Sequence, residues 1–190
     1  MDLIELGGKP AGLFTGFDIT DRKSAEEEVL HMVASDPLTG LANYRRLVEV
    51  FETETQRSRR TGRSFALLLL DLDGLKKVND EHGHLTGSRA LCRLANVLRN
   101  QCRTIDIVAR HGGDEFAVIL PETGIEGAQQ LARRISQRLS SDGQHPSLSV
   151  SVGAAVYPHD GQTYEDLFGA ADRTLYQMKE HGGGNLRQSA

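Results

Sequence analysis

Four acidic residues occupy positions where carboxylates can do chemistry. Asp71 and Asp73 come directly after the apolar run 65–70, and Asp114 and Glu115 follow two glycines at a predicted hairpin turn. If that strand and hairpin are neighbours in one sheet, Asp71, Asp114 and Glu115 meet at its edge. Carboxylates this close repel each other unless cations lie between them, and oxygen-only clusters suit Mg²⁺. Because Mg²⁺ also binds substrate phosphates, the combination predicts a nucleoside triphosphate site, although each acid alone is more simply a solvated surface charge.

The elements that must position these acids follow from the apolar pattern. The continuous apolar run indicates a buried strand, and apolar residues at helical spacing predict helices around it. Strands are predicted at 64–72, 106–109, 116–120 and 148–157, and helices at 43–59, 75–81, 86–102, 128–139 and 164–181. The helix at 43–59 is expected to bury Tyr44, Leu47, Val48 and Phe51. Cys102 is expected to be a small core residue rather than a reactive thiol.

Composition excludes several classes of protein. The chain has 190 residues, a formal charge of −4 and two cysteines, so neither a disulfide framework nor a zinc set is expected. No apolar run approaches the roughly 20 residues that a membrane span needs, and no secretory signal is visible. The absence of a basic block argues against a nucleic-acid polymer as partner. We therefore expect a cytoplasmic domain without membrane contact in this fragment, in a parent protein that can still be tethered to a membrane.

Several stretches in chain order resemble the motifs of the GGDEF family of diguanylate cyclases. The signature is the stretch Arg110–Phe116, which reads RHGGDEF. The other matching stretches are 36–41 (DPLTGL), 71–73 (DLD), 79–84 (NDEHGH), 151–158 (SVGAAVYP) and 171–179 (ADRTLYQMK). Together they extend over about four fifths of the chain, from residue 36 to residue 185.

The resemblance implies an α+β fold for residues 36–190. It predicts a central mixed or antiparallel five-stranded sheet flanked by helices, as in the palm-like nucleotidyl cyclases, preceded by an N-terminal linker helix. Residues 1–35 would be a separate segment, with a strand at 12–17 and a helix at 22–34. The stretch 16–23 resembles the closing strand and exit of a PAS sensor domain, and the alternative is an ordinary N-terminal arm.

The activity implied by the resemblance is condensation of two GTP into the bacterial second messenger cyclic di-GMP, with release of two pyrophosphates. Two domains would form a homodimer, because each 3′-hydroxyl must attack the α-phosphate bound by the other domain. By similarity, Asp71, Asp114, Glu115 and the Leu72 carbonyl would hold Mg²⁺ or Mn²⁺, two ions per active site. Glu115, or Asp114 itself, would help to deprotonate the 3′-hydroxyl.

The substrate-binding residues implied by the resemblance lie on several separate stretches. They are Asn79, His84 and Ser88 for guanine, the backbone of Gly74 and Leu75 and the Lys179 ammonium for the phosphates, and Gly112 and Gly113 for close approach of the hairpin. His82 and His84 are not expected to form a zinc site, because no third soft ligand is near.

Two residues depart from the family pattern. Ser88 stands where the family usually has an Asp that contacts guanine N1 and N2, and Gly183 stands where a phosphate-binding Arg is common. Losing a charge-assisted hydrogen bond costs roughly 1.5–3 kcal/mol, so Ser88 is expected to weaken GTP binding or to relax guanine selectivity. The alternative function is therefore a weak or degenerate GGDEF module that binds GTP or cyclic di-GMP and regulates a neighbouring domain. Template-directed nucleotidyl transfer shares the metal chemistry, but the sequence lacks a basic template groove.

Arg103 and Asp106 form an R-x-x-D pair six residues before Gly112. The pair matches the family's inhibitory site, where cyclic di-GMP acts as product and inhibitor. The Arg would bind a phosphate or guanine and the Asp a base edge. The structural alternative is an exposed ion pair worth less than about 1 kcal/mol.

Overall fold

The structure is a computed structural model that describes residues 3–6, 9–12 and 34–180. The chain divides into two compact units, residues 1–33 and 34–190. In the first unit, β1 (Leu3–Leu6) and β2 (Lys9–Gly12) form an antiparallel hairpin that the sequence did not predict. Most of the predicted strand at 12–17 and nearly all of the predicted helix at 22–34 lie outside the described residues.

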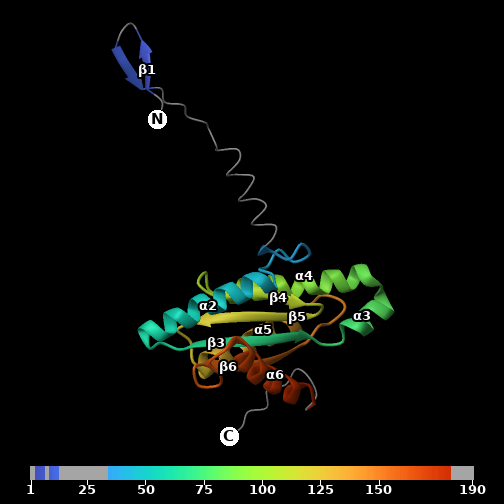
Figure 1. Cartoon of the computed structure of the whole chain (residues 1–190). Coiled ribbons are helices and arrows are strands. Elements are labelled where there is room, and N and C mark those ends of the chain that lie inside the picture. Colours follow the sequence, from blue (N-terminus) through green and yellow to red (C-terminus); the bar gives the residue numbers. More distant parts are fainter. Residues whose placement is uncertain (1–2, 7–8, 13–33, 181–190) are drawn as a thin grey trace. The chain divides into compact units, whose positions relative to one another are not determined.

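The second unit is built on a four-stranded antiparallel sheet in the order β4-β5-β3-β6 (Figure 1). The strands are β3 (Phe65–Leu72), β4 (Ile107–Gly112), β5 (Glu115–Pro121) and β6 (Val150–Tyr157). The helices are α2 (Tyr44–Thr61), α3 (Leu75–His82), α4 (His84–Gln101), α5 (Ile125–Ser140) and α6 (Tyr164–Glu180). The arrangement is the predicted palm-like α+β fold. Among the described helices, none combines the length and the hydrophobicity of a membrane span.

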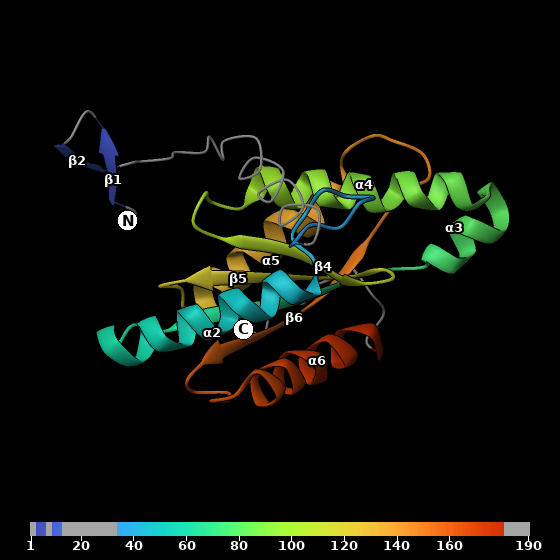
Figure 2. The ribbon, with the colours of Figure 1, turned by 45° about the horizontal axis from the view of Figure 1, so that its top comes forward.

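Helices cover both faces of the sheet, which explains the continuous apolar run in β3 (Figure 2). Leu68 and Leu70 lie in a core built with α4 and α5, whereas Phe65 and Leu67 lie in a second core built with α2 and α6. Because successive side chains of a strand point to opposite faces, β3 must be apolar at every position to fill both cores. The ends of β3 are therefore held firmly in place.

The sheet is antiparallel, which was one of the two predicted arrangements, but within the described residues it has four strands and not the predicted five. In place of a fifth strand, Ala42 forms a single parallel bridge to β4. Its N–H donates to the Val108 carbonyl at 3.2 Å, and its carbonyl accepts from the Arg110 N–H at 2.8 Å. The segment cannot extend further because the next residue, Asn43, caps α2 by accepting a hydrogen bond from the Arg46 N–H at 3.1 Å.

The buried side of α2 is narrower than predicted. Leu47 and Phe51 are buried as expected, Val48 is half-buried, and Tyr44 is 49% exposed. Tyr44 lies in the first turn, where its ring packs edge-on against His111 at a centroid distance of 5.1 Å instead of entering the core. It therefore contacts the hairpin that carries Asp114 and Glu115.

Candidate active site

The ends of β3 and β5 bring three acidic residues to one edge of the sheet. Asp71 is the register partner of Glu115, and the Leu72 N–H donates to the Asp114 carbonyl at 3.1 Å. Asp71 is buried, Asp114 is half-buried, and the Glu115 side chain is 53% exposed. The strand and the hairpin are thus neighbours, which is the condition that the sequence argument required.

A cation from α6 lies at this edge. Lys179 Nζ lies 2.8 Å from Asp71 Oδ2. Burial raises the pKa of the Asp71 carboxyl, and the hydrogen bond and positive charge of Lys179 lower it. The negative charges of Asp114 and Asp73 oppose Lys179, so the pKa of Asp71 stays above its ordinary value. A positive charge beside Asp71 is therefore favourable, and here the ammonium supplies it.

Asp73 has a different environment from Asp71, although the two lie on the same motif. Its Oδ2 accepts from the Ser149 hydroxyl and its Oδ1 from the Ser151 hydroxyl, both at 2.7 Å. The Asp73 N–H also donates to the Ser149 carbonyl at 3.0 Å. These bonds hold the end of β3 to β6, so Asp73 supports the site from the neighbouring strand.

Arg110 ties the glycine hairpin to the segment that precedes α2. Its Nε and Nη2 donate to the Gly113 carbonyl at 3.1 and 2.6 Å, and its Nη1 donates to both oxygens of Asp36 at 3.2 and 3.3 Å. Asp36 also accepts from the N–H and hydroxyl of Thr39. Gly113 has a φ of +33°, and a Cβ on Gly112 or Gly113 would meet open space. Arg110 thus fixes the hairpin backbone on one side, while the space next to the Cα atoms of Gly112 and Gly113 is open.

Glu115 has a partner that the sequence argument missed. His111 Nδ1 lies 3.2 Å from Glu115 Oε2. The imidazole is held between the rings of Tyr44 and Phe168, with centroid distances of 5.1 and 4.7 Å. The available signal was the position of His111 immediately before the two glycines, which places it four positions from Glu115 across the tight turn. His111 therefore orients the more exposed of the two hairpin acids.

The predicted guanine-binding residues lie where α3 meets α4. α3 starts after Gly74, whose φ is 69°, and no side chain caps its first N–H groups, so the amide of Leu75 is among those left to a ligand or water. Near the other end of α3, Asn79 packs against α4, where a Cβ on Gly87 would overlap Asn79 Oδ1 and lie 2.9 Å from its Cγ. Gly87 is thus a positioning residue that the sequence argument did not single out. Figure 1 shows this helix pair at one end of the unit.

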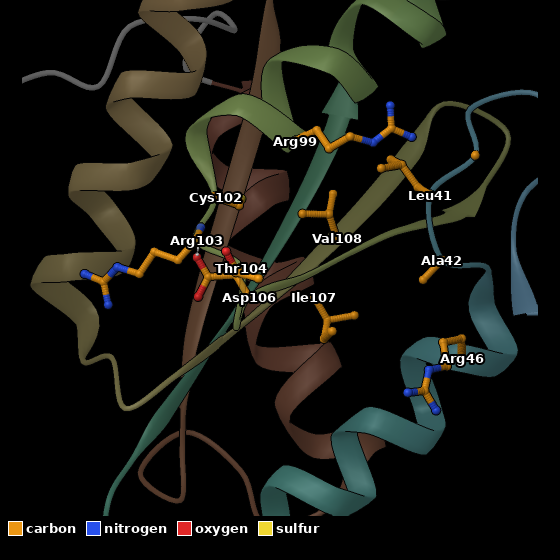
Figure 3. Close-up of a pocket in the computed structure, with 11 residues that line it drawn as sticks. Leu41, Ala42, Arg46, Arg99, Cys102, Arg103, Thr104, Asp106, Ile107 and Val108 are labelled. Atoms are coloured by element: carbon orange, nitrogen blue, oxygen red, sulfur yellow. Dashed lines mark hydrogen bonds between the residues drawn. The ribbon is translucent and has the colours of Figure 1, made fainter.

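The R-x-x-D pair lies on a separate pocket of about 400 Å³. Asp106 is 9% exposed; its Oδ2 accepts from the Arg103 N–H at 2.7 Å, and its Oδ1 is buried without a hydrogen-bond partner in the described chain. In Figure 3 the Arg103 side chain extends away from the middle of the pocket, and Arg99 and Arg46 lie elsewhere on its lining. No side-chain ion pair joins Arg103 and Asp106 within residues 34–180, so the simpler alternative is not what the structure contains.

Comparison with known families identifies the fold and its motifs. The family described as "Diguanylate cyclase, GGDEF domain" matches residues 33–185. The chain belongs to the GGDEF family. The glycine hairpin of this GGDEF domain is the turn between β4 and β5, and the acids of the motif are Asp114 and Glu115.

Relatives of this GGDEF domain include named diguanylate cyclases. Diguanylate cyclase DgcM of Escherichia coli K12 is 36% identical over 182 residues, which cover 94% of this chain and 44% of DgcM. An uncharacterized signaling protein of Caulobacter vibrioides is 37% identical over 90% of this chain and 22% of its own length. The chain thus spans less than half the length of these relatives. The crystal structure of the coiled coil and GGDEF domain of DgcB from Caulobacter crescentus, in complex with c-di-GMP, is 25% identical, with a TM-score of 0.81 and coverage of 88% of this chain and 91% of that one.

Proposed function

We propose that this chain is a diguanylate cyclase domain that condenses two GTP into cyclic di-GMP and releases two pyrophosphates. The observation that carries the proposal is the meeting of Asp71, Asp114 and Glu115 at the edge formed by β3 and β5. Relatives named diguanylate cyclase, such as DgcM, support the same reaction. Each 3′-hydroxyl attacks the α-phosphorus of the other nucleotide, and the bond from that phosphorus to pyrophosphate breaks.

Divalent ions, Mg²⁺ or Mn²⁺ and two per active site, fit the residues at this edge. Asp71 and Asp114, with the Leu72 carbonyl and Glu115, would hold them. Within the described residues, no group of three or more His, Cys, Asp or Glu side chains is arranged to hold a metal alone. Mg²⁺ does not need one, because it binds one or two carboxylates together with water and substrate phosphates. The ions would lower the pKa of the attacking hydroxyl and neutralise the phosphates.

The remaining groups at the edge take roles that suit their positions. Glu115, or Asp114 itself, would receive the proton of the 3′-hydroxyl, with His111 keeping the Glu115 carboxylate in place. Lys179, now on Asp71, would turn to the triphosphate when cations occupy the carboxylates. The uncapped N–H groups after Gly74, including that of Leu75, would bind phosphate oxygens.

The base and the partner nucleotide complete the reaction. Asn79, His84 and Ser88 would contact the guanine, and Gly112 and Gly113 would let the hairpin backbone approach the nucleotide. One set of carboxylates serves one nucleotide, so catalysis requires two domains facing each other as a homodimer.

Product inhibition is proposed for the pocket at Arg103 and Asp106. The buried, unpaired Oδ1 of Asp106 supports it, because an N–H of a guanine edge would satisfy that atom. Arg134 would contribute a further cation, since its Nη2 donates at 3.0 Å to the carbonyl of Gln101, the residue before Cys102 on the pocket lining. The relative DgcB was crystallised with c-di-GMP.

The N-terminal segment would be the exit of a PAS sensor domain followed by a signalling helix, in a protein whose GGDEF domain faces the cytoplasm. Residues 1–35 and 36–190 would then be separate functional segments. A second candidate function is favoured by Ser88, which replaces the usual Asp: a weak module that binds GTP or cyclic di-GMP and regulates a neighbouring domain.

The decisive experiment incubates the protein at high concentration with GTP and Mg²⁺ and separates the products by chromatography. Cyclic di-GMP is expected from the native chain and not from Asp114→Asn. A native chain that binds GTP but makes no product supports the regulatory module instead. Arg103→Ala should retain turnover and lose inhibition by added cyclic di-GMP; unchanged inhibition in this variant contradicts the proposed inhibitory site.

A further inference from the structure

The ammonium of Lys179 contacts the same carboxylate that the proposed function gives to a divalent ion. Lys179 Nζ lies 2.8 Å from Asp71 Oδ2. Mg²⁺ binds an oxygen at about 2.0–2.1 Å, so an ion on this oxygen and the ammonium would lie side by side and repel each other. The lysine and a divalent ion therefore compete for Asp71.

Lys179 is the residue that balances the charge of Asp71. Asp71 is buried, and the neighbouring negative charge of Asp114 adds to the cost of ionising it. Within residues 34–180, the contact with Lys179 is the only salt bridge of Asp71. The cation of the hairpin, Arg110, donates instead to Asp36 and to a backbone carbonyl. Asp71 therefore depends on Lys179 for a positive charge unless a metal ion supplies one.

Lys179 is placed so that its ammonium can leave Asp71. It stands in the last turn of α6, and its side chain is 42% exposed, against 12% for that of Asp71. A lysine carries its charge on a flexible four-carbon stem, so the ammonium can turn without moving the helix. The Asp71 backbone is held in the sheet between its register partners, Glu115 on β5 and Ser151 on β6. The partner that can move is thus the cation, not the carboxylate.

Given the proposed function, on which this inference rests, we propose that Lys179 keeps divalent ions off Asp71 until a nucleotide binds. The phosphates of the nucleotide attract the ammonium away from the carboxylate and supply further oxygens for the ion, so the two changes come together. An ion without nucleotide must displace the ammonium and leave two cations side by side. By linkage, nucleotide and ion raise each other's affinity by one common factor, which we expect to be about tenfold or more.

The test uses Mn²⁺ alone as the probe, because electron paramagnetic resonance measures its free ions directly. The native chain is expected to bind Mn²⁺ weakly, and about tenfold more tightly once a GTP analogue with a methylene bridge between its α- and β-phosphates is added. This analogue cannot release pyrophosphate. Without any nucleotide, Lys179→Met should bind Mn²⁺ about tenfold more tightly than the native chain. Equal affinity of the native chain and Lys179→Met for Mn²⁺ overturns the proposal.

Three further variants assign a gain in Mn²⁺ binding to the contact itself. Lys179→Arg keeps a cation at the end of α6 and should bind Mn²⁺ as weakly as the native chain. Lys77→Met removes the same charge from α3, where Lys77 pairs with Glu81 at 3.8 Å, and should also leave Mn²⁺ binding unchanged. Asp71→Asn, introduced into Lys179→Met, should abolish the gain. A similar gain in Lys77→Met, or one that survives Asp71→Asn, contradicts the proposal, because it would reflect net charge or another site.

Product analysis separates failure of this inference from failure of the proposed function. If the native chain makes cyclic di-GMP from GTP and Mg²⁺ but binds Mn²⁺ as tightly as Lys179→Met, the inference is overturned and the cyclase stands. If Lys179→Met gains Mn²⁺ binding but the native chain makes no cyclic di-GMP, Lys179 still controls the metal site and the cyclase is overturned.

Discussion

The Arg110 clamp gives the sharpest quantitative prediction from this structure. Arg110→Met keeps most of the side-chain volume and removes the hydrogen bonds to Asp36 and to the Gly113 carbonyl. Removing one partner of a buried ion pair costs about 3–5 kcal/mol. The Arg110 and Asp36 side chains are each 16% exposed, and Thr39 still satisfies Asp36 with two hydrogen bonds, so the expected loss is smaller. We expect the free energy of unfolding to fall by about 2–3 kcal/mol.

The assay is urea denaturation followed by circular dichroism, together with a thermal melt. For a domain of this size, about 2–4 °C of Tm accompanies each kcal/mol, so a fall of roughly 4–12 °C is expected. Arg110→Lys is the matched control: it keeps the charge but lacks the planar fork, and should recover only part of the loss. A double-mutant cycle with Asp36→Asn should show coupling between the two residues. If the two substitutions are additive, or Arg110→Met costs less than about 0.5 kcal/mol, the clamp is refuted.

Three further predictions test other parts of the site. His111→Phe keeps the ring packing but loses the bond to Glu115, so kcat should fall about tenfold at unchanged KM. His111→Asn should restore part of the lost kcat. Equal kcat in the native chain and both variants argues against a role of His111 in orienting Glu115. Gly87→Ala displaces the Asn79 amide, so KM for GTP should rise about tenfold while Tm changes little. An unchanged KM would count against binding of the base where α3 meets α4. The pKa of Asp36 is lowered because, although burial raises it, the hydrogen bonds from Thr39 and Arg110 outweigh burial. Because the pKa of Asp36 is lower in the folded than in the unfolded chain, the ionised carboxylate stabilises the fold at pH values above its unfolded pKa. This stabilisation is lost as the pH falls through the folded pKa, so the native chain should lose stability below about pH 4 more steeply than Asp36→Asn. Urea titrations at several pH values measure the difference.

The local features of the site could be predicted because each depends on neighbouring residues. The apolar run of β3 marks a strand buried on both faces, and its last apolar residue fixes where Asp71 begins the edge. The paired glycines fix the turn between β4 and β5, so the positions of Asp114 and Glu115 follow. These predictions needed no knowledge of what lies across the sheet.

Several features that the sequence did not predict join distant segments. Arg110 forms hydrogen bonds with Asp36, 74 positions away, and Asp73 accepts a hydrogen bond from Ser151, 78 positions away. Such contacts depend on strand order and register, which the apolar pattern does not contain. The prediction of a fifth strand was wrong for a related reason. The pairing of Ala42 with β4 ends there because the next residue caps α2.

The architecture places the residues proposed to bind the base and those proposed to act at phosphorus on different elements. The side chains proposed to bind guanine lie on α3 and α4, whereas Asp71, Asp114 and Glu115 lie on the sheet edge and are held by the hairpin and by α6. In the proposed enzyme, a substitution at Ser88 would alter binding of the base without moving a carboxylate, and a substitution at the hairpin would alter turnover without altering binding of the base. For this reason we expect the loss of the usual Asp at position 88 to affect binding of the base rather than turnover. If Ser88 marked a decaying site, the acids would be free to change as well; instead Asp71, Asp114 and Glu115 meet at one edge with their motif intact.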